Sequence, residues 1–435
     1  MKAFQFGLFA VATAAFLGSG AEAQQPGTPA ATVIAIPPMT TPDSGTKGNE
    51  MLAIAWQATQ LVDTDLEQTA EILPLKPDRN DYYSYPEVTA PNFLKWRGRG
   101  AKALITGFVK SRPDGRYTVG CYVYDVEKGR ELAREGYVII PADLRRAAHK
   151  CSGLAYKAIT GSPGMFDTRI AYVAETGSPA ARVKRIAIMD SDGFNHKYLT
   201  SGDTTVLTPR LSPHAAKLAY VGFEGGIPEV RILDLANGEQ RPLIPGDAMT
   251  FAPRYSPDGS KIVFSMMVGA NSDIYVVGAN GGTPRRLTVS PAIDTDASFS
   301  PDGSRIVFES DRSGTQQLYV MNADGSQQRR ITFSTAAYSA PEWSPDGNLI
   351  AFTWRIGGTR RIGIIAPDGT GEKVLTAGST DEEPSWAASS REIVFQRTDS
   401  SGRTALYRVS LDGSAPRRIT IPQGGSDPNW SGTMD

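Results

Sequence analysis

The chain offers few side chains of the kinds that usually carry catalysis or bind metals. It contains three histidines (His149, His196 and His214) and two cysteines (Cys121 and Cys151) in 435 residues. Catalytic and metal sites use such residues at defined spacings, as in Gly-x-Ser-x-Gly, His-Glu-x-x-His or Cys-x-x-Cys, and none of these spacings occurs. A phosphate-binding loop is also absent. We therefore expect a protein that is not an enzyme, with no catalytic residue, no metal and no cofactor.

Aspartate-rich turns are the remaining candidates for ion binding. Residues 190–193 read Asp-Ser-Asp-Gly, as in the start of a calcium loop, but the other ligands and the terminal glutamate of such a loop are missing. An ordinary hairpin turn accounts for the same residues. His214 replaces the aspartate of one repeated turn and is expected at the surface.

These turns belong to a repeat of 44 residues. An apolar stretch recurs six times without a slip in its spacing, and its central residues are Ile186, Val230, Ile274, Leu318, Ile362 and Leu406. A period in the forties with several short strands is typical of a β-propeller. Because one repeat cannot bury both faces of its small sheet, the repeats must stack around an axis.

The ends of the repeat region predict how the ring closes. Residues 255–259, 299–303 and 343–347 each hold a strand end followed by Ser-Pro-Asp-Gly, a tight turn between the first and second strands of a blade (strands A and B). The first repeat lacks strand A, and residues 427–431 match a strand A with no strand B after it. We expect this last strand to complete the first blade. The prediction is an all-β six-bladed β-propeller over residues 163–435.

A smaller N-terminal α/β domain should precede the propeller. Residues 1–23 combine Lys2, an apolar run and Ala-Glu-Ala, the pattern of a cleavable signal peptide. Residues 24–31 are polar and proline-rich and should form a mobile arm. Residues 32–162 then alternate between the strand and helix periods, with a strand expected at 32–36 and helices at 50–61 and 142–161. An exported protein of this kind fits the bacterial periplasm.

The charge balance excludes some partners. Lysine and arginine number 45 against 46 acidic residues, so no field favours nucleic acid or an anionic membrane. No segment after the leader is long and apolar enough to span a bilayer, so we expect no direct membrane insertion. We expect a monomer.

The two cysteines are a candidate disulfide. Cys121 shares the apolar face of a strand-like run at 116–124, and Cys151 lies on the apolar stripe of the helix-like run at 142–159. Both sulfurs should therefore point into the same core. An oxidising compartment favours a Cys121–Cys151 bond. Two buried small side chains that never bond remain the alternative.

Strand topology leaves one face of the ring free. In an antiparallel blade the A–B and C–D turns lie on one face, and the B–C loops and the D–A connections lie on the other. The first domain enters beside the A–B turns, so the D–A face should be free to dock a partner. Six acids near its strands could form an acidic collar: Asp294, Asp296, Asp381, Glu382, Glu383 and Asp427. Ordinary solvated loops, with each proline leading into a strand, are the alternative reading.

Domain order and the junction at 159–173 resemble those of the TolB family of the Tol–Pal envelope system, over the whole mature chain. The resemblance implies binding of the lipoprotein Pal at the D–A face, of TolA by the N-terminal arm, and a role in outer-membrane invagination during division and in envelope integrity. Other outer-membrane proteins are further candidate partners. The expected Pal-facing residues are Ala252, Pro253, Thr295, Asp296, Ala340, Pro341, Glu383, Pro384 and Asp427. The expected TolA-binding residues are Gln24, Gln25, Pro26, Gly27 and Thr28.

A second class of function stays open on the sequence. A propeller can also serve as a periplasmic hydrolase or a glycan-binding protein that uses the mouth of its central channel. Turnover or binding of a small molecule at that mouth would favour this alternative.

Overall fold

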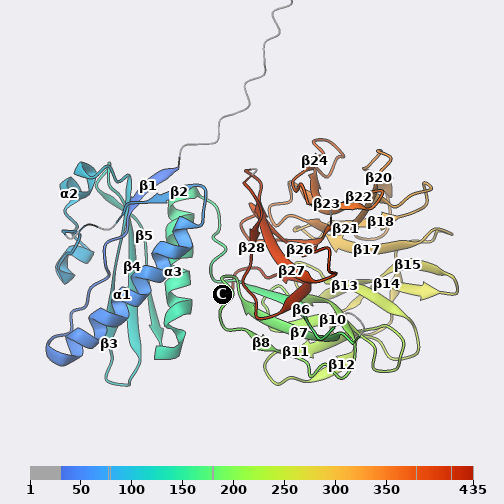
Figure 1. Ribbon diagram of the computed structural model, residues 1–435, viewed down its shortest axis with the longest axis horizontal. Coiled ribbons are helices and arrows are strands. Elements are labelled where there is room, and N and C mark those ends of the chain that lie inside the picture. Colours follow the sequence, from blue (N-terminus) through green and yellow to red (C-terminus); the bar gives the residue numbers. More distant parts are fainter. Residues whose placement is uncertain are drawn as a thin grey trace, which may run out of the picture. The chain divides into compact units, whose positions relative to one another are not determined.

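The computed structural model describes residues 31–434 apart from 77, 79, 179, 180, 379 and 413. Within these residues it contains one five-stranded sheet with helices and six four-stranded sheets (Figure 1). The expected leader at 1–23 and all of the expected arm except Ala31 lie outside the described residues. No helix of the described part is both long and apolar enough to cross a bilayer.

The α/β domain is built on a mixed sheet of order β2-β1-β3-β4-β5. Strand β1 pairs in parallel with β2 and β3, whereas β3, β4 and β5 are antiparallel neighbours. Its elements are β1 Thr32–Ala35, α1 Gly45–Glu67, β2 Ile72–Pro74, η1 Tyr85–Val88, α2 Phe93–Gly98, β3 Ala103–Ser111, β4 Tyr117–Asp125, β5 Arg130–Ile139, η2 Pro141–Asp143 and α3 Leu144–Thr160. Helix α3 ends at Gly161, whose φ of 77° is the left-handed conformation that glycine adopts without strain.

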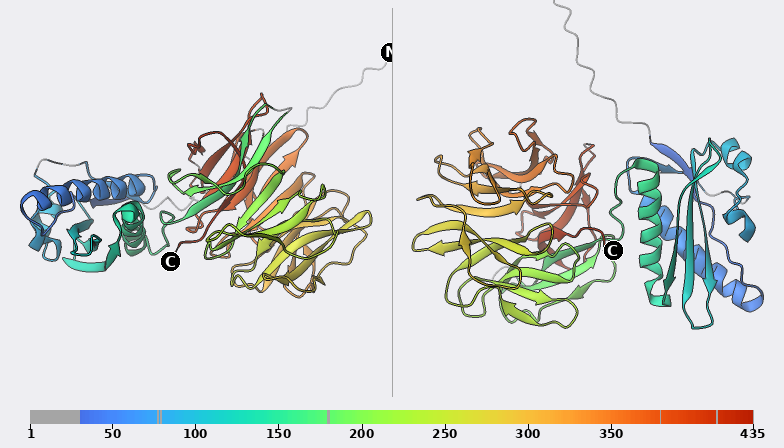
Figure 2. Two further views of the ribbon diagram at one scale, coloured as in Figure 1. Left: turned by 90° about the horizontal axis from the view of Figure 1, so that it is seen from below. Right: turned by 180° about the vertical axis from the view of Figure 1, so that it is seen from behind.

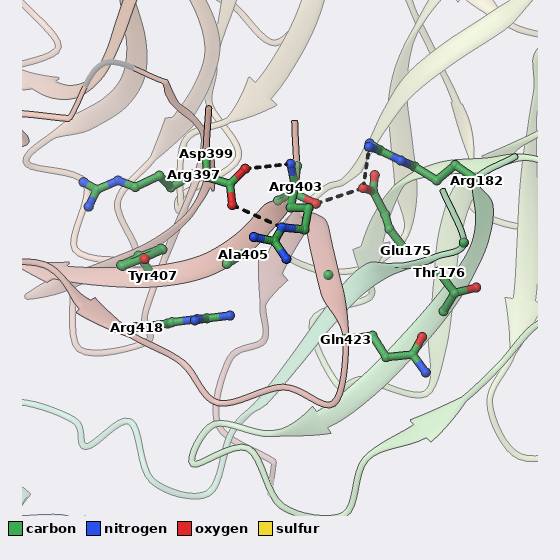
Figure 3. A pocket seen from close by; sticks show the side chains of 13 residues that line it. Glu175, Thr176, Arg182, Arg397, Asp399, Arg403, Ala405, Tyr407, Arg418 and Gln423 are labelled. Atoms are coloured by element: carbon green, nitrogen blue, oxygen red, sulfur yellow. Dashed lines mark hydrogen bonds and ion pairs between the residues drawn. The ribbon is translucent and has the colours of Figure 1, made fainter. Parts of the chain in front are cut away.

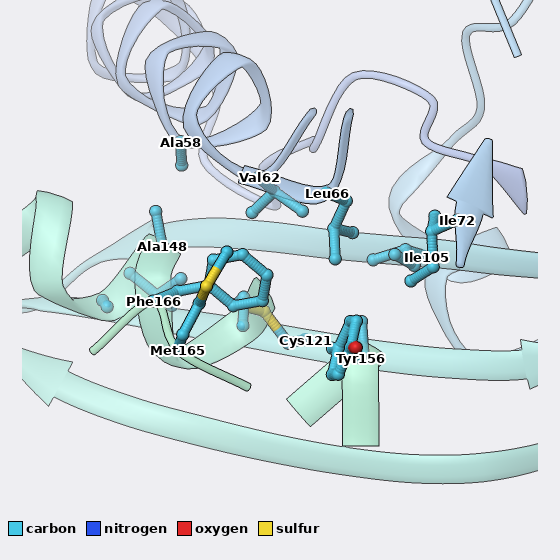
Figure 4. Close-up of a cluster of buried hydrophobic side chains, with 14 of the residues drawn as sticks. Ala58, Val62, Leu66, Ile72, Ile105, Cys121, Ala148, Tyr156, Met165 and Phe166 are labelled. Atoms are coloured by element: carbon cyan, nitrogen blue, oxygen red, sulfur yellow. A yellow bond between two sulfur atoms is a disulfide. The ribbon is translucent and has the colours of Figure 1, made fainter. Parts of the chain in front are cut away.

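Helices α1 and α3 bury their apolar stripes against the sheet (Figure 4). Val62 and Leu66 of α1 and Ala148 of α3 are fully buried in this core. Cys121 of β4 and Cys151 of α3 lie in the same core with no exposed surface. Their sulfurs are joined in a disulfide, with Cα atoms 5.8 Å apart, so the bond ties the helix directly to the sheet.

The repeat region forms the six-bladed ring that the sequence predicts (Figures 1 and 2). In each blade, strands A to D run outward from the axis in an antiparallel sheet. Blade 1 is β29 Gly424–Trp430, β6 Arg169–Thr176, β7 Val183–Asp190 and β8 Lys197–Tyr198; blade 2 is β9 Val206–Leu211, β10 Lys217–Gly222, β11 Glu229–Asp234 and β12 Gln240–Pro242; blade 3 is β13 Thr250–Tyr255, β14 Lys261–Val268, β15 Asn271–Gly278 and β16 Arg285–Arg286. Blade 4 is β17 Asp294–Phe299, β18 Arg305–Ser310, β19 Gln317–Asn322 and β20 Arg329–Arg330; blade 5 is β21 Ala337–Trp343, β22 Ile350–Ile356, β23 Thr359–Ile365 and β24 Lys373–Val374; blade 6 is β25 Asp381–Trp386, β26 Glu392–Thr398, β27 Thr404–Ser410 and β28 Arg417–Arg418.

One aromatic side chain from each strand B fills the space between blades. These six residues, each less than 2% exposed, are Tyr172, Tyr220, Phe264, Phe308, Phe352 and Phe395. A buried aromatic ring contributes about 3–5 kcal/mol relative to alanine. The repeat therefore supplies one large apolar anchor for each interface between blades.

The Ser-Pro-Asp-Gly turns are fixed by hydrogen bonds of their own residues. In blade 3, Asp258 accepts from the Ser256 hydroxyl at 2.5 Å and from the Ser260 amide at 3.1 Å. Hydrogen bonds from Ser256 and then Ser260 lower the pKa of Asp258 to about 2. Gly259 has a φ of 69° and donates to the Ser256 carbonyl at 2.8 Å. The aspartates of these turns are thus used locally to reverse the chain.

The C-terminal strand closes the ring, as the sequence predicts. Strand β29 pairs with β6 of blade 1, and Figure 2 shows the last segment of the chain beside the first blade. The Ser431 amide donates to the Arg169 carbonyl at 2.8 Å, and the Trp430 indole donates to the Thr168 hydroxyl at 2.8 Å. Closure covers an edge of β6 that would otherwise be open.

Side chains of the α/β domain reach the blades on the side of the A–B and C–D turns. His149 Nε2 of α3 lies 3.3 Å from Asp192 Oδ2, in the turn between β7 and β8. Arg145 of α3 also pairs with Asp192, and Arg391, after the A–B turn of blade 6, pairs with Glu71. The hydrogen bonds and ion pairs that join this domain to the blades, within the described residues, all reach this side.

Candidate functional site

Every strand A carries a β-bulge at the same place. One residue in each bulge has a φ between 46° and 54°, although none of the six is glycine: Thr208, Ala252, Asp296, Ala340, Glu383 and Asp427. The pairing of strand A with strand B shifts at each of these positions. A left-handed conformation costs a non-glycine residue roughly 1–2 kcal/mol, so the surrounding blades must hold it in place.

The bulges correct the place that we expected for these residues. We expected them in the D–A connections, but they lie inside strand A. Four of the expected Pal-facing residues are half-buried, namely Ala252, Asp296, Glu383 and Asp427. The other five are buried: Pro253, Thr295, Ala340, Pro341 and Pro384. These five therefore shape the mouth of the central channel and offer little contact surface of their own.

Thr295 illustrates the difference. Its side chain is buried, and its hydroxyl donates to Glu309 Oε1 at 2.6 Å. Burial, and then the nearby Asp296, raise the pKa of Glu309 to about 8. Thr295 thus solvates a buried acid on the neighbouring strand and does not face outward.

Charged side chains from different blades meet at the centre of the ring. Arg210 of blade 2 lies 3.3 Å from Glu383 of blade 6, and Arg254 of blade 3 pairs with Glu342 of blade 5. Burial, and then Asp427, raise the pKa of Glu383 to about 7, and burial raises the pKa of Asp427. Ion pairs therefore cross the centre of the ring between blades, and Glu383 and Asp427 hold their protons more strongly than in water.

Only part of the expected acidic collar exists. Asp296, Glu383 and Asp427 converge near the channel, since each contributes to the electrostatic environment of another. Asp294 and Asp381 have no exposed surface. They pair with arginines of their own blades: Asp294 with Arg312 of the B–C loop at 2.7 Å, and Asp381 with Arg397 of strand B at 2.6 Å. These two aspartates are structural and cannot attract a partner directly.

The D–A face also carries exposed apolar side chains that the sequence reasoning missed. Nine large apolar side chains of the described propeller residues are exposed. Phe194 and Tyr198 lie near the C–D turn of blade 1. The other seven lie at the B–C ends of strands B and in the D–A connections around blades 3 to 5. Together we call them the apolar surface: Met249, Met267, Val268, Val289, Ile293, Phe333 and Ile356.

Two residues of the apolar surface could have been recognised from the repeat in the sequence. Val289 and Phe333 occupy equivalent positions 44 residues apart, directly after a threonine that lies two residues beyond strand D. They are 79% and 73% exposed, although turn residues are the usual choice at such places. Apolar side chains gathered on one face of a soluble protein usually mark a surface that meets a partner.

Two family models match the chain. The TolB beta propeller domain matches residues 156–434, and the TolB amino-terminal domain matches residues 25–132. The chain belongs to the TolB family. Within the described residues of this TolB-family protein, no group of three or more histidine, cysteine, aspartate or glutamate side chains is arranged to hold a metal ion.

Relatives and a solved structure agree with this assignment to the TolB family. The chain is 48% identical over 206 residues to the Tol-Pal system protein TolB of Zymomonas mobilis, a match that covers 47% of this chain and 45% of the relative. It is 49% identical over 191 residues to the protein of that name from Rhizorhabdus wittichii, covering 44% of each. The matches thus span less than half the length of these curated relatives. The crystal structure of TolB from Acinetobacter baumannii has a TM-score of 0.78 and 29% identity, and the match covers 92% of this chain and 97% of that one.

Proposed function

We propose that this protein is a periplasmic scaffold of the Tol–Pal system that binds the lipoprotein Pal at its D–A face and TolA through the arm at residues 24–31. Through these two partners it would support outer-membrane invagination during division and the integrity of the envelope. The names of the relatives, Tol-Pal system proteins, support membership of the system. We choose this binding face because the exposed side chains of the apolar surface lie on it, opposite the α/β domain.

The features of the D–A face suit a protein partner. The apolar surface offers area that a partner could remove from water, at roughly 25 cal/mol for each Å² buried. The neighbouring channel mouth presents Asp296, Glu383 and Asp427, which are only half-buried. Apolar contacts beside a few polar groups are typical of specific protein interfaces.

Pal binding tests the choice of face. The double variant Val289→Ser with Phe333→Ser removes the two most exposed members of the apolar surface. We expect its affinity for purified Pal, measured by calorimetry, to fall about tenfold or more, because central apolar contacts dominate interface energies. Leu94→Ser is the matched control, since Leu94 of α2 is 75% exposed but lies in the other domain. Equal Pal affinity for the double variant and the wild type would contradict the proposed face.

TolA binding tests the arm separately. Removal of residues 24–28 should abolish capture of TolA while Pal affinity stays unchanged, because the two partners use different parts of the chain. Undiminished TolA capture by this deletion would contradict the arm as the binding segment.

A further inference from the structure

A polar groove opens between blade 6 and blade 1, beside the strand that closes the ring. It has a volume of about 660 Å³, within the range of ligand sites, and its walls come from both blades. Four arginines line it: Arg182, Arg397, Arg403 and Arg418 (Figure 3). We call it the seam groove. It lies away from the apolar surface and shares no residue with the acids of the channel.

The groove exists because one repeat position is small in blade 6 alone. The residue before the central apolar residue of strand C is polar or charged in five blades and alanine in the sixth: Arg185, Glu229, Asp273, Gln317, Arg361 and Ala405. In several blades this side chain bonds to the connection that follows strand D. Gln317 donates to the Ala336 carbonyl at 2.8 Å, and Arg361 donates to the Gly378 carbonyl at 3.3 Å. Ala405 has no group that could make such a bond, so the space beside it stays open.

The alanine at position 405 also leaves Arg418 without the acidic partner that its equivalent in blade 3 has. Arg286 of blade 3 and Arg418 occupy equivalent positions on strand D. Arg286 pairs with Asp273 and donates to the Thr288 carbonyl at 2.8 Å. Ala405 stands where Asp273 would be, and among the described residues the Arg418 guanidinium has no hydrogen bond or ion pair. Its donors point toward the seam groove without a partner (Figure 3).

The two acids that line the seam groove, Glu175 and Asp399, already pair with neighbouring groups of the protein. The groups that remain available to a ligand are therefore cationic. Glu175 is 8% exposed and accepts from Arg182 at 3.0 Å, from Thr404 at 2.9 Å and from Ser426 at 3.0 Å. Asp399 accepts from Ser401 and lies 3.4 Å from Arg403 Nε. The side chain of Arg403 is 79% exposed, which leaves its two terminal nitrogens facing solvent.

Arg397 shows that the groove is held in shape. Two of its nitrogens bond to Asp381, at 2.6 Å and 2.9 Å. Its guanidinium also lies 4.6 Å from the ring centre of Tyr407. Among the described residues that line the groove, Tyr407 is the only aromatic one. Because the guanidinium covers its ring, the ring does not offer a free face on which a sugar could stack.

We propose that the seam groove binds an extended peptide segment of a protein partner through its carboxylates, which pair with Arg418 and Arg403. Guanidinium groups bind planar carboxylates through paired hydrogen bonds, and the groove is far larger than a single inorganic anion requires. Strand β27 runs on at Thr404 and Ala405 past its pairing with β28, which involves Tyr407 and Arg408. An extended chain could lie along this stretch. The proposal is independent of Pal binding at the apolar surface.

Binding of a labelled peptide to the purified mature chain tests the proposal. The probe is a fluorescein-labelled peptide of alternating glutamate and glycine, and its matched control has glutamine in place of glutamate. We expect the glutamate peptide to bind, the glutamine peptide to bind at least about tenfold more weakly, and added salt to weaken the binding. Inorganic phosphate serves as a competitor that distinguishes a peptide site from a general anion site.

Two variants test whether the unpaired Arg418 binds the peptide. Arg418→Gln removes the released cation at an exposed position and should weaken the glutamate peptide about tenfold. Ala405→Asp should do the same without removing any cation, because it rebuilds the Asp273–Arg286 pair of blade 3 and occupies Arg418 internally. Arg330→Gln is the control, since the equivalent arginine of blade 4 already donates to the Thr332 carbonyl.

Three results would overturn the proposal. They are no binding of the glutamate peptide, peptide binding that both Ala405→Asp and Arg418→Gln leave unchanged, and displacement of the peptide by phosphate at an affinity equal to its own. The Val289→Ser and Phe333→Ser double variant should bind the peptide as the wild type does. Failure of Pal binding would therefore leave this result unaffected, and the two proposals can fail separately.

Discussion

Glu309 is a buried acid near the channel, on strand β18 of blade 4. It is 5% exposed, it accepts a hydrogen bond from Thr295, and no arginine or lysine pairs with it among the described residues. Burial, and then Asp296, raise the pKa of Glu309 to about 8. The folded protein therefore keeps a proton at neutral pH that the unfolded chain has already lost.

Glu309→Gln should stabilise the protein at alkaline pH. Because the folded pKa is the higher one, the contribution of Glu309 to stability is present below its unfolded pKa of about 4.5 and is lost as pH rises through about 8. Denaturant unfolding near pH 8 should show the variant more stable than the wild type by about 4 kcal/mol, with little difference near pH 4.5. A difference that does not change with pH would contradict the protonated state of Glu309.

The roles of single residues were the least predictable from the sequence. The sequence groups Asp294 and Asp381 with the channel acids, because both lie where the chain enters a strand A. Their true partners, Arg312 and Arg397, lie 18 and 16 residues further on, at places where the repeat varies from blade to blade. The position of a residue in the repeat predicts the strand on which it lies, but it does not predict which residue pairs with a buried charge. The seam groove was missed for a related reason. Ala405 is unusual only when the equivalent positions of all six blades are compared.

At the scale of elements, the disulfide links α3 to β4 and closes a loop with a sequence separation of 30 residues. Cross-linking a loop of this length restricts the unfolded chain and is expected to stabilise the fold by about 3 kcal/mol. The double variant Cys121→Ser with Cys151→Ser should lose about that amount in denaturant unfolding. The wild type treated with a reductant should behave like the variant. Equal stability of the oxidised and reduced wild type would contradict a structural disulfide.

Regular periodicity explains which elements could be predicted. The strands of the blades and helix α3 have strong repeats of apolar residues, and their places were predicted closely. Helix α1 runs from Gly45 to Glu67, beyond the expected 50–61, because its ends carry polar residues that weaken the pattern. Strand β2 and its parallel pairing with β1 were missed, since three residues carry no period and the pairing is set by tertiary contacts. The left-handed bulges were missed because no glycine marks them.

At the scale of the whole molecule, the ring places two different surfaces on the side away from the α/β domain. The apolar surface lies around blades 3 to 5, and the seam groove lies where blade 6 meets blade 1. The seam groove depends on the closure of the ring, because it takes its walls from the first and the last blades. We therefore expect closure to matter for the proposed peptide binding at the seam groove as well as for stability.

Removal of residues 427–435 tests this dependence directly. The deletion takes away most of β29, including Trp430, which is 5% exposed and donates to Thr168. Loss of a buried tryptophan alone costs about 3–5 kcal/mol, and the uncovered edge of β6 adds to this cost, so thermal unfolding should shift to a clearly lower temperature. A chain that ends after Ser431 keeps β29 whole and should unfold close to the wild type. If the chain that lacks residues 427–435 unfolded at the wild-type temperature, β29 would not be the strand that holds the ring closed, and the arrangement of its two free surfaces would need another cause.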